Sequence, residues 1–493
     1  MEFLNPEDKR ARTIKLFTGY ILIAILVGLA TLILVYLAQG YGYDPSKGVS
    51  QNGLVFLDAK PGSANVLIDN QDKGTTATRV TLAEGTHEVT LKKDKYRDWN
   101  KTISVDGGSV FYLVYPRLFP VDIALGITQS YATAPGFASE SLDRHWLVVQ
   151  PKADVPSLTL LDLLKPTDDA KTAALPVAQL ISDGSGYGKF TPIEWSDDNK
   201  HLLLKQTLTS GRAAYIVYDR EDVTQSFNVT KKLSIGDTVS VSLRDKAYDN
   251  YYLFTPATGA IQTADLKSGV QAAPIVAGVV SFKSYADNLI LYVTYTGAKD
   301  TEANVYVLKD QKDTYMLQSV ARDASARYQL DMAKYEDNWL YATSSSTDKK
   351  VFVYRNPLDK AKPANTTAIS PRFALLLNSP QSISFSDNAR FISMQSGKQF
   401  VVYDAELARV YRYTSPLAFA DTQAATWMDG HRLTAVTDGK VQVFDFDGTN
   451  LQTLTASRPE FIVYFDRDYQ YVYTIIQQAD GRSALQNGRL IVN

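Results

Sequence analysis

The chain has no cysteine, and its 493 residues include only four histidines and five methionines. The absence of cysteine excludes disulfides, thiol catalysis and thiolate metal sites. Basic and acidic residues nearly balance, at 51 and 53, so the formal net charge is -2. Because nucleic-acid binding requires an excess of basic side chains, we expect no nucleic-acid partner.

The few histidines do not form a recognisable chemical site. They are His87, His145, His201 and His431, and none has a spacing typical of metal ligands or of a catalytic pair. His201 and His431 closely follow predicted hairpin turns, so we interpret them as solvated turn histidines. The sequence therefore predicts no catalytic residue, no metal ligand and no cofactor, and it leaves the binding residues open.

An uncharged run near the N-terminus predicts a membrane-spanning helix. Residues 1–15 are polar and basic, and residues 16–38 carry no charge, which exceeds the about 20 residues that a spanning helix needs. The positive-inside rule places residues 1–15 in the cytoplasm and everything after residue 40 outside the cell membrane. A cleaved signal peptide, with Ala38-Gln39-Gly40 as its cleavage site, is the alternative. The length of the run favours an uncleaved anchor.

A spacer and a small all-β domain are expected next. Residues 39–52 contain glycine, proline and serine and predict a short spacer. Residues 53–120 contain short strand-like runs separated by turn residues, at 54–57, 66–69, 79–82, 87–91, 102–105 and 110–115. Lys73-Gly74 is among the predicted turns.

This small domain resembles the PEGA domain. Pro61-Gly62-Ser63-Ala64 stands where the name-giving Pro-Glu-Gly-Ala occurs, and Gly74-Thr75, Leu82-Ala83-Glu84-Gly85 and Tyr96-Arg97-Asp98-Trp99 follow in the family's order. The proline that usually follows Gly74-Thr75 is missing. The resemblance implies a β-sandwich of envelope proteins that acts as an extracytoplasmic spacer or adhesion-like module without chemistry of its own.

One hairpin motif recurs through residues 121–493. Its clearest copy is the segment 195–204, with an aromatic residue, an Asp-containing turn and an apolar strand. Related turns recur every 40 to 55 residues or so, the period of a four-stranded propeller blade. We take the aspartate of each turn as a marker, because its carboxylate accepts from a backbone N–H two residues on. The markers are Asp143, Asp198, Asp249, Asp287, Asp337, Asp387, Asp429 and Asp468.

The repeat resembles known propeller families. Trp195-Ser196-Asp197-Asp198-Asn199-Lys200 is similar to the Trp-Ser-Pro-Asp-Gly-Lys hairpin of WD40-like propellers, such as the Tol-system periplasmic protein and prolyl oligopeptidases. The resemblance implies a propeller, and the eight hairpin copies predict eight blades, or seven if the Asp143 copy is not a blade. We expect residues 123–131 to complete the last blade and close the ring. No hydrolase domain accompanies the repeats, so no peptidase activity is implied.

Two further motifs have ordinary explanations. The segment 184–188 is glycine-rich, but it lacks the spacing of a phosphate cradle or of a nucleophile elbow, so we interpret it as a flexible loop between blades. Asp445-Phe446-Asp447-Gly448-Thr449-Asn450 resembles the start of a calcium loop. Ala456 stands where the bidentate acid is needed, so a turn is the better interpretation.

The sequence as a whole predicts an all-β, membrane-anchored protein of the cell envelope. We expect it to be a non-catalytic binding or scaffolding module whose propeller holds a protein or a cell-wall glycan. The 30 tyrosines allow for carbohydrate stacking. The alternative is a polysaccharide-active enzyme, a glycoside hydrolase or a lyase, which requires two carboxylates that converge at the ring axis.

Overall fold

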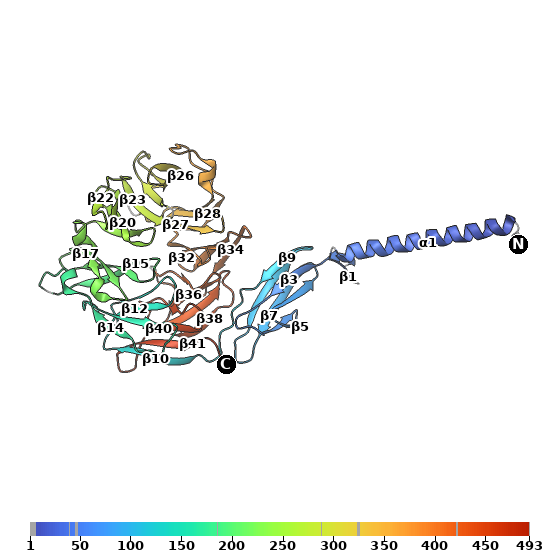
Figure 1. Ribbon diagram of the computed structural model, residues 1–493, viewed down its shortest axis with the longest axis horizontal. Helices are drawn as coiled ribbons and strands as arrows, with labels where there is room; N and C mark the ends of the chain where they lie inside the picture. The colour runs from blue at the N-terminus through green and yellow to red at the C-terminus, as the bar shows by residue number, and fades with distance from the viewer. Residues whose placement is uncertain are drawn as a thin grey trace. The chain divides into compact units, whose positions relative to one another are not determined.

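The computed structural model describes residues 6–38, 40–44, 48–184, 186–286, 288–322, 326–420 and 423–492. The chain divides into two compact units, Met1–Asp122 and Ile123–Asn493. In Figure 1 the first unit is blue to light blue and the second runs from cyan to red. Each unit is described by itself.

The first unit begins with a long apolar helix, α1 (Pro6–Ala38). Its segment Arg10–Ala38 is long and apolar enough to cross a membrane, with a mean hydropathy of 2.9. The helix extends ahead of the apolar run to Pro6, a residue suited to a first helical turn because its missing N–H would have no helical partner. The residues expected to form a spacer contain two short antiparallel strands, β1 (Tyr41–Asp44) and β2 (Gly48–Gln51).

The rest of the first unit is a β-sandwich. One sheet has the order β6-β3-β9 and the other the order β5-β4-β7-β8. The strands are β3 (Gly53–Leu57), β4 (Asn65–Ile68), β5 (Gln71–Thr75), β6 (Thr78–Leu82), β7 (Gly85–Lys92), β8 (Trp99–Val105) and β9 (Val110–Leu113). Alternate side chains such as Val55, Val66 and Trp99 are fully buried, as a two-layer core requires. The predicted turn at Lys73-Gly74 is wrong, because both residues lie inside β5.

The described part of the second unit contains eight four-stranded antiparallel sheets, so the fold is an eight-bladed β-propeller. Blade 1 is β11 (Phe137–Glu140), β12 (Trp146–Gln150), β13 (Ser157–Asp162) and β14 (Lys171–Ala174); blade 2 is β15 (Lys189–Trp195), β16 (His201–Thr207), β17 (Ala213–Asp219) and β18 (Phe227–Asn228). Blade 3 is β19 (Ser240–Arg244), β20 (Ala247–Thr255), β21 (Ala260–Asp265) and β22 (Val270–Gln271); blade 4 is β23 (Val279–Tyr285), β24 (Leu289–Thr294), β25 (Glu302–Lys309) and β26 (Asp313–Ala321).

The remaining blades follow the same plan. Blade 5 is β27 (Tyr328–Tyr335), β28 (Asn338–Ser345), β29 (Lys350–Arg355) and β30 (Phe373–Leu376); blade 6 is β31 (Ser382–Phe385), β32 (Phe391–Ser396), β33 (Gln399–Asp404) and β34 (Arg409–Thr414). Blade 7 is β35 (Thr426–Trp427), β36 (Arg432–Thr437), β37 (Lys440–Asp445) and β38 (Gln452–Ala456). Short helices lie in the connections: η1 (Val177–Gln179), η2 (Val223–Gln225), α2 (Val229–Lys232) and η3 (Pro357–Lys360).

Blade 8 joins the two ends of the propeller. Its strands are β39 (Tyr464–Phe465), β40 (Tyr471–Gln477), β41 (Ser483–Arg489) and, from the start of the unit, β10 (Ala124–Tyr131). β10 pairs with β41 in antiparallel register, and the two strands lie side by side in Figure 1. The predicted closure is confirmed. The Asp143 copy is a true blade, so the count is eight and not seven.

The blades contact one another through apolar side chains and repeated polar pairs. Leu202, Leu204 and Ile216 of blade 2 pack against Phe137 and Val148 of blade 1, and burying each such side chain contributes about 1.5–3 kcal/mol. The indole of a first-strand tryptophan also reaches a serine of the preceding blade. The two examples are Trp195 Nε1 to Ser139 Oγ at 3.0 Å and Trp427 Nε1 to Ser384 Oγ at 3.1 Å.

The predicted hydrogen bond from a backbone N–H to the turn aspartate two residues earlier is confirmed in blades 1, 2 and 7. The Asp198 carboxylate accepts from the backbone N–H of Lys200 at 2.8 Å, and Asp429 accepts from that of His431 at 2.8 Å. Asp143 accepts from His145 N–H at 3.2 Å. These carboxylates therefore hold the turn between the first and second strands.

Several predicted turn acceptors differ from those in the structure. In blade 6 the acceptor is Asn388, not Asp387, and in blade 8 it is Asp466, not Asp468. Asp249 lies inside β20, because the chain turns earlier, between Arg244 and Ala247. Asp337 does lie in the two-residue turn between the first and second strands of blade 5. Asp287 lies outside the described residues. In blades 6 and 8 a polar residue within two positions of the predicted one is therefore the acceptor.

Candidate functional site

A cavity of about 530 Å³ lies at the axis of the propeller, on the face formed by the turns between first and second strands. First strands of neighbouring blades contact each other, β11 with β15, β15 with β19, β23 with β27, β27 with β31 and β31 with β35. Residues of five consecutive blades line the cavity, from β15 of blade 2 to the turn after β31 of blade 6. Five carboxylates and two lysines are among them: Glu194, Asp197, Asp245, Asp331, Asp387, Lys246 and Lys283. We call this space the axial cavity.

The two carboxylates on first strands of the axial cavity are held by neighbouring blades. Glu194 forms an ion pair with Lys246 of the next blade and accepts from Leu243 N–H at 2.6 Å. Asp331 accepts from Phe385 N–H at 3.3 Å and lies 3.8 Å from Lys283 Nζ. Each carboxylate thus ties one blade to the next as well as lining the cavity.

Arg144 bridges the ring beside the axial cavity. It lies in the first turn of blade 1, with φ of 54°. Its guanidinium donates to the Met428 carbonyl at 2.6 Å, to Asp387 Oδ2 at 2.5 Å and to the Tyr469 hydroxyl. These partners belong to blades 7, 6 and 8. One arginine of blade 1 therefore connects its blade to blades 6, 7 and 8.

The buried carboxyls beside Arg144 are electrostatically perturbed. Burial raises the pKa of Glu140 to about 8, against the opposing effects of Arg144 at 3.6 Å and of Phe465 N–H at 3.0 Å. Burial also raises the pKa of Asp387 and of Asp331, although Arg144 and Lys283 counteract it. A raised carboxyl pKa suits a general acid, but burial in a structural network produces the same shift.

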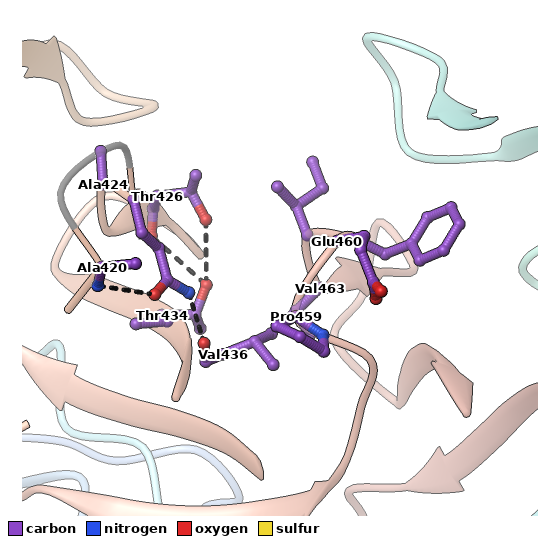
Figure 2. Close-up of a pocket in the computed structure, with 12 residues that line it drawn as sticks. Ala420, Ala424, Thr426, Thr434, Val436, Pro459, Glu460 and Val463 are labelled. Carbon is purple, nitrogen blue, oxygen red and sulfur yellow. Dashed lines mark hydrogen bonds between the residues drawn. The ribbon is translucent and has the colours of Figure 1, made fainter. Parts of the chain in front are cut away.

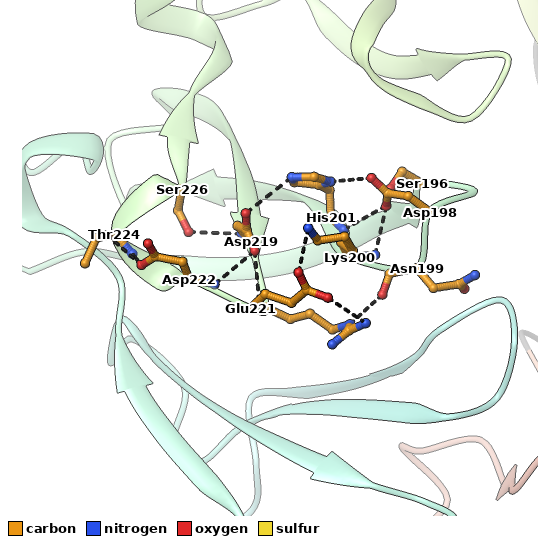
Figure 3. A network of polar contacts seen from close by, with 11 residues as sticks. Ser196, Asp198, Asn199, Lys200, His201, Asp219, Glu221, Asp222, Thr224 and Ser226 are labelled. Atoms are coloured by element: carbon orange, nitrogen blue, oxygen red, sulfur yellow. Dashed lines mark hydrogen bonds and ion pairs between the residues drawn. The ribbon is translucent and has the colours of Figure 1, made fainter.

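Figure 3 shows a second polar network, at the first turn of blade 2. His201 lies between two carboxylates, with Nδ1 at 2.6 Å from Asp198 and Nε2 at 3.5 Å from Asp219. The Tyr248 ring stacks on the imidazole at 3.8 Å. Both ring nitrogens of His201 therefore face carboxylates of the protein itself. His201 is buried, so its interpretation as a solvated histidine is wrong.

The same arrangement recurs in other blades with arginine in place of histidine. Arg432 Nη1 lies 2.6 Å from Asp429, and its Nε lies 3.6 Å from Asp445. Arg390 pairs with Asp404 at 2.8 Å. In each case a basic side chain at or just before the start of the second strand meets the aspartate that ends the third strand. We call this pairing the strand-end ion pair. In the sequence it is marked by a histidine or an arginine that follows the turn acceptor by two or three residues.

The other motifs have structural positions that fit a turn or a connection. The segment 184–188 connects blades 1 and 2, and Ser185 lies outside the described residues. Asp445 ends β37, where it accepts from Asn450 Nδ2 at 2.9 Å and faces Arg432. Over the described ranges, no group of three or more His, Cys, Asp or Glu side chains is placed to hold a metal ion.

A smaller cavity, of about 320 Å³, lies on the opposite face between blades 7 and 8 (Figure 2). Ala424, Thr426 and Val436 form one wall, and Pro459 and Val463 form the other. Its lining combines apolar side chains with Gln423, Thr426, Thr434 and Glu460. The two threonine hydroxyls pair with each other at 3.2 Å, and the Gln423 amide donates to the Val436 carbonyl, so part of this polar lining is already bonded within the protein.

The comparison with protein families supports the fold of the first unit. Residues 52–116 match the model of the PEGA domain family. No curated protein matches the chain. Among solved structures, the β-propeller domain of Myceliophteria thermophila Cps50 (Swd1) is similar, at 9% identity and a TM-score of 0.39 over 75% of this chain and all of that one.

Another similar structure is Porphyromonas gingivalis dipeptidyl peptidase 4, at 12% identity and a TM-score of 0.48. The match covers 72% of this chain and 58% of that one. Kluyvelomyces marxianus Hsv2 is similar at 11% identity and a TM-score of 0.35, over 62% and 98% of the two chains. Similarities this distant carry no argument about activity or partner.

Proposed function

We propose that this chain is a single-pass, membrane-anchored binding protein of the cell envelope, with its N-terminus in the cytoplasm and its propeller outside. The apolar helix α1 supports the anchor, and the PEGA match supports an envelope location. In this proposal the sandwich is a spacer, and the propeller holds the partner. The protein acts as a scaffold without chemistry of its own.

The observation that carries the proposal is the state of the carboxylates of the axial cavity. Glu194 is fixed by Lys246 and by the Leu243 N–H, both of blade 3. Asp331 is fixed by Lys283 of blade 4 and by the Phe385 N–H of blade 6. Glycoside hydrolysis needs one carboxyl to donate a proton and a second to act on the sugar or on water. Carboxylates committed to holding blades together are poorly suited to these roles, which favours recognition over catalysis.

The charge of the axial cavity favours a basic partner. Glu194 and Asp331 lie near Lys246 and Lys283, and Asp387 pairs with Arg144. Two further carboxylates, Asp197 and Asp245, line the cavity, and Asp197 is exposed. Electrostatic complementarity steers association and rejects partners of the wrong sign. We therefore propose that the axial cavity receives a lysine- or arginine-bearing segment of an envelope protein.

Photocrosslinking in intact cells tests this proposal. A benzoylphenylalanine at Tyr285, which lines the axial cavity, should form an adduct with one partner, and the yield should fall several-fold in an Asp197→Lys background. The matched control carries the crosslinker at Asp438, an exposed turn residue at the far end of β36. Equal adducts from both positions, or none from Tyr285, would contradict an axial partner site.

A further inference from the structure

The outer face of one sheet of the sandwich is apolar and exposed, although a sheet face in water is usually polar. β9 is the edge strand of the sheet β6-β3-β9, and its outward side chains Val110, Tyr112 and Val114 are 52%, 62% and 52% exposed. The Phe56 ring of β3 stacks on the Tyr112 ring at 5.1 Å, and Leu54 of β3 pairs with Val110. We call the surface formed by these five side chains the outer apolar face.

The edge strand of the other sheet of the sandwich has a different composition. β8 is the edge strand of the sheet β5-β4-β7-β8, and its outward, exposed side chains are Asn100, Thr102 and Ser104. Exposed edge strands usually carry polar or charged side chains, because apolar ones promote association with another chain. β9 lacks this protection. A contiguous exposed apolar surface of this kind marks a contact with another molecule.

The outer apolar face is complementary to a second copy of itself. Arg79 of β6, Phe56 of β3 and Tyr112 of β9 are partners in the strand register, so they form one row across the sheet. A rotation of 180° about an axis parallel to β3 keeps this row at the same height and exchanges its two ends. Arg79, which is exposed, then lies against the Tyr112 ring of the other copy in a cation–aromatic contact, and the two Phe56 rings meet at the centre.

The membrane-spanning helix sets the symmetry that this contact requires. The sandwich begins directly after α1, because the Asn52 N–H donates to the Gly40 carbonyl at 2.8 Å. The Leu54 N–H donates to the Ser109 carbonyl at 2.9 Å, so β3 and β9 both start at this end and run away from it. Two chains anchored in one membrane have the same orientation. The twofold axis that relates them therefore runs along the membrane normal, and the two outer apolar faces keep the same height.

The size of the outer apolar face fits a contact that depends on the anchor. Three strands about 4.8 Å apart and five residues of about 3.3 Å each span about 240 Å² in plan. A stable interface usually buries about 800 Å² on each partner. The outer apolar face is thus too small to hold two free domains together, but two chains confined to one membrane meet at a much higher effective concentration.

We infer that the outer apolar face is the dimer contact of this chain, formed between two membrane-anchored copies through Phe56, Tyr112 and Arg79. The inference rests on the membrane anchor of the proposed function, but not on the partner of the axial cavity. A dimer presents two propellers to a partner, which raises the avidity for a multivalent partner without a new contact to it.

Disulfide crosslinking in membranes of cells that express the full chain tests this inference. The chain has no cysteine, so Leu54→Cys introduces a single thiol. Because β3 lies at the twofold axis, copper phenanthroline should link Leu54→Cys chains into dimers. Thr102→Cys, on the outward face of β8, is the matched control. It should form several-fold fewer dimers, although Thr102 is more exposed than Leu54.

Substitutions in the Leu54→Cys background test the residues of the contact. Tyr112→Asp and Arg79→Glu should each lower the dimer yield several-fold, and Arg79→Lys, which keeps the cation, should retain most of it. Asn100→Asp, on the polar face of the other sheet, should leave the yield unchanged. Because all three replaced side chains are exposed, the unfolding temperatures of these variants should match that of the parent.

The inference is overturned if Leu54→Cys and Thr102→Cys crosslink equally, if Tyr112→Asp leaves the yield unchanged, or if the adduct contains another protein. A chain that stays in carbonate-washed membranes without forming the Leu54→Cys dimer would contradict the dimer and leave the anchor intact. Release of the chain by the carbonate wash would contradict the anchor and the dimer together. Loss of the Tyr285 adduct with an intact dimer would contradict only the axial proposal.

Discussion

Replacing Arg432 with methionine is expected to lower the free energy of unfolding of the propeller by about 3–5 kcal/mol. The Arg432 side chain is only 4% exposed and lies between Asp429 and Asp445. Methionine fills similar space but leaves both buried carboxylates without their cation. Removing one partner of a buried ion pair lowers the free energy of unfolding by more than the intact pair contributes, because the remaining charges stay desolvated. Urea denaturation of the full chain in detergent measures the change.

Arg482→Met is the control for Arg432→Met. Arg482 also pairs with an aspartate, Asp480, at 2.7 Å, but the two side chains are 56% and 50% exposed. An exposed pair contributes about 0–1 kcal/mol, so this variant should unfold close to the wild-type denaturant concentration. Equal effects of the two substitutions would mean that the strand-end ion pairs do not stabilise the blades.

Replacing Glu140 with glutamine is expected to stabilise the propeller at pH 9 by a few kcal/mol and to leave it nearly unchanged at pH 5. The pKa of Glu140 is raised by burial to about 8, above its value of about 4.5 in the unfolded chain. A raised carboxyl pKa gives stability that is fully present below about pH 4.5 and is lost as the pH rises through about 8. Glutamine has no proton to lose and can still accept from Phe465 N–H.

The measurement for Glu140→Gln is the unfolding free energy at pH 5, 7 and 9 against the wild type. Glu221→Gln is the control, because that side chain is 50% exposed and pairs with Lys200 at the surface. The control should differ from the wild type by less than about 1 kcal/mol at each pH. If the Glu140→Gln difference does not grow with pH, Glu140 is ionised in the native ring and pairs favourably with Arg144.

Local patterns in the sequence predicted the architecture well. Alternating strands, turn aspartates and a period of about 40 to 55 residues are local features, and they are sufficient to identify blades. The missing strand of blade 8 also identified β10 as the closing strand. The prediction failed where neighbouring residues share chemistry. Asp387 and Asn388 are both good turn acceptors, and only the fold shows which one faces the turn.

The candidate sites were far less predictable. Arg144 and Asp387 are 243 residues apart, and they meet only because the closed ring brings blades 1 and 6 to the same axis. The residues that line the axial cavity likewise come from five blades, and no local pattern in the sequence groups them. The strand-end ion pairs could have been found, since His201 and Arg432 recur at corresponding places after their turns.

The most direct test of the account is the location of the propeller relative to the membrane. The chain has no cysteine, so single-cysteine variants can be labelled without background. In intact cells a membrane-impermeant maleimide should modify Asp438→Cys, and it should modify Thr13→Cys only after the membrane is permeabilised. Modification of Thr13→Cys alone in intact cells, with Asp438→Cys protected, would place the propeller inside and contradict an envelope binding protein.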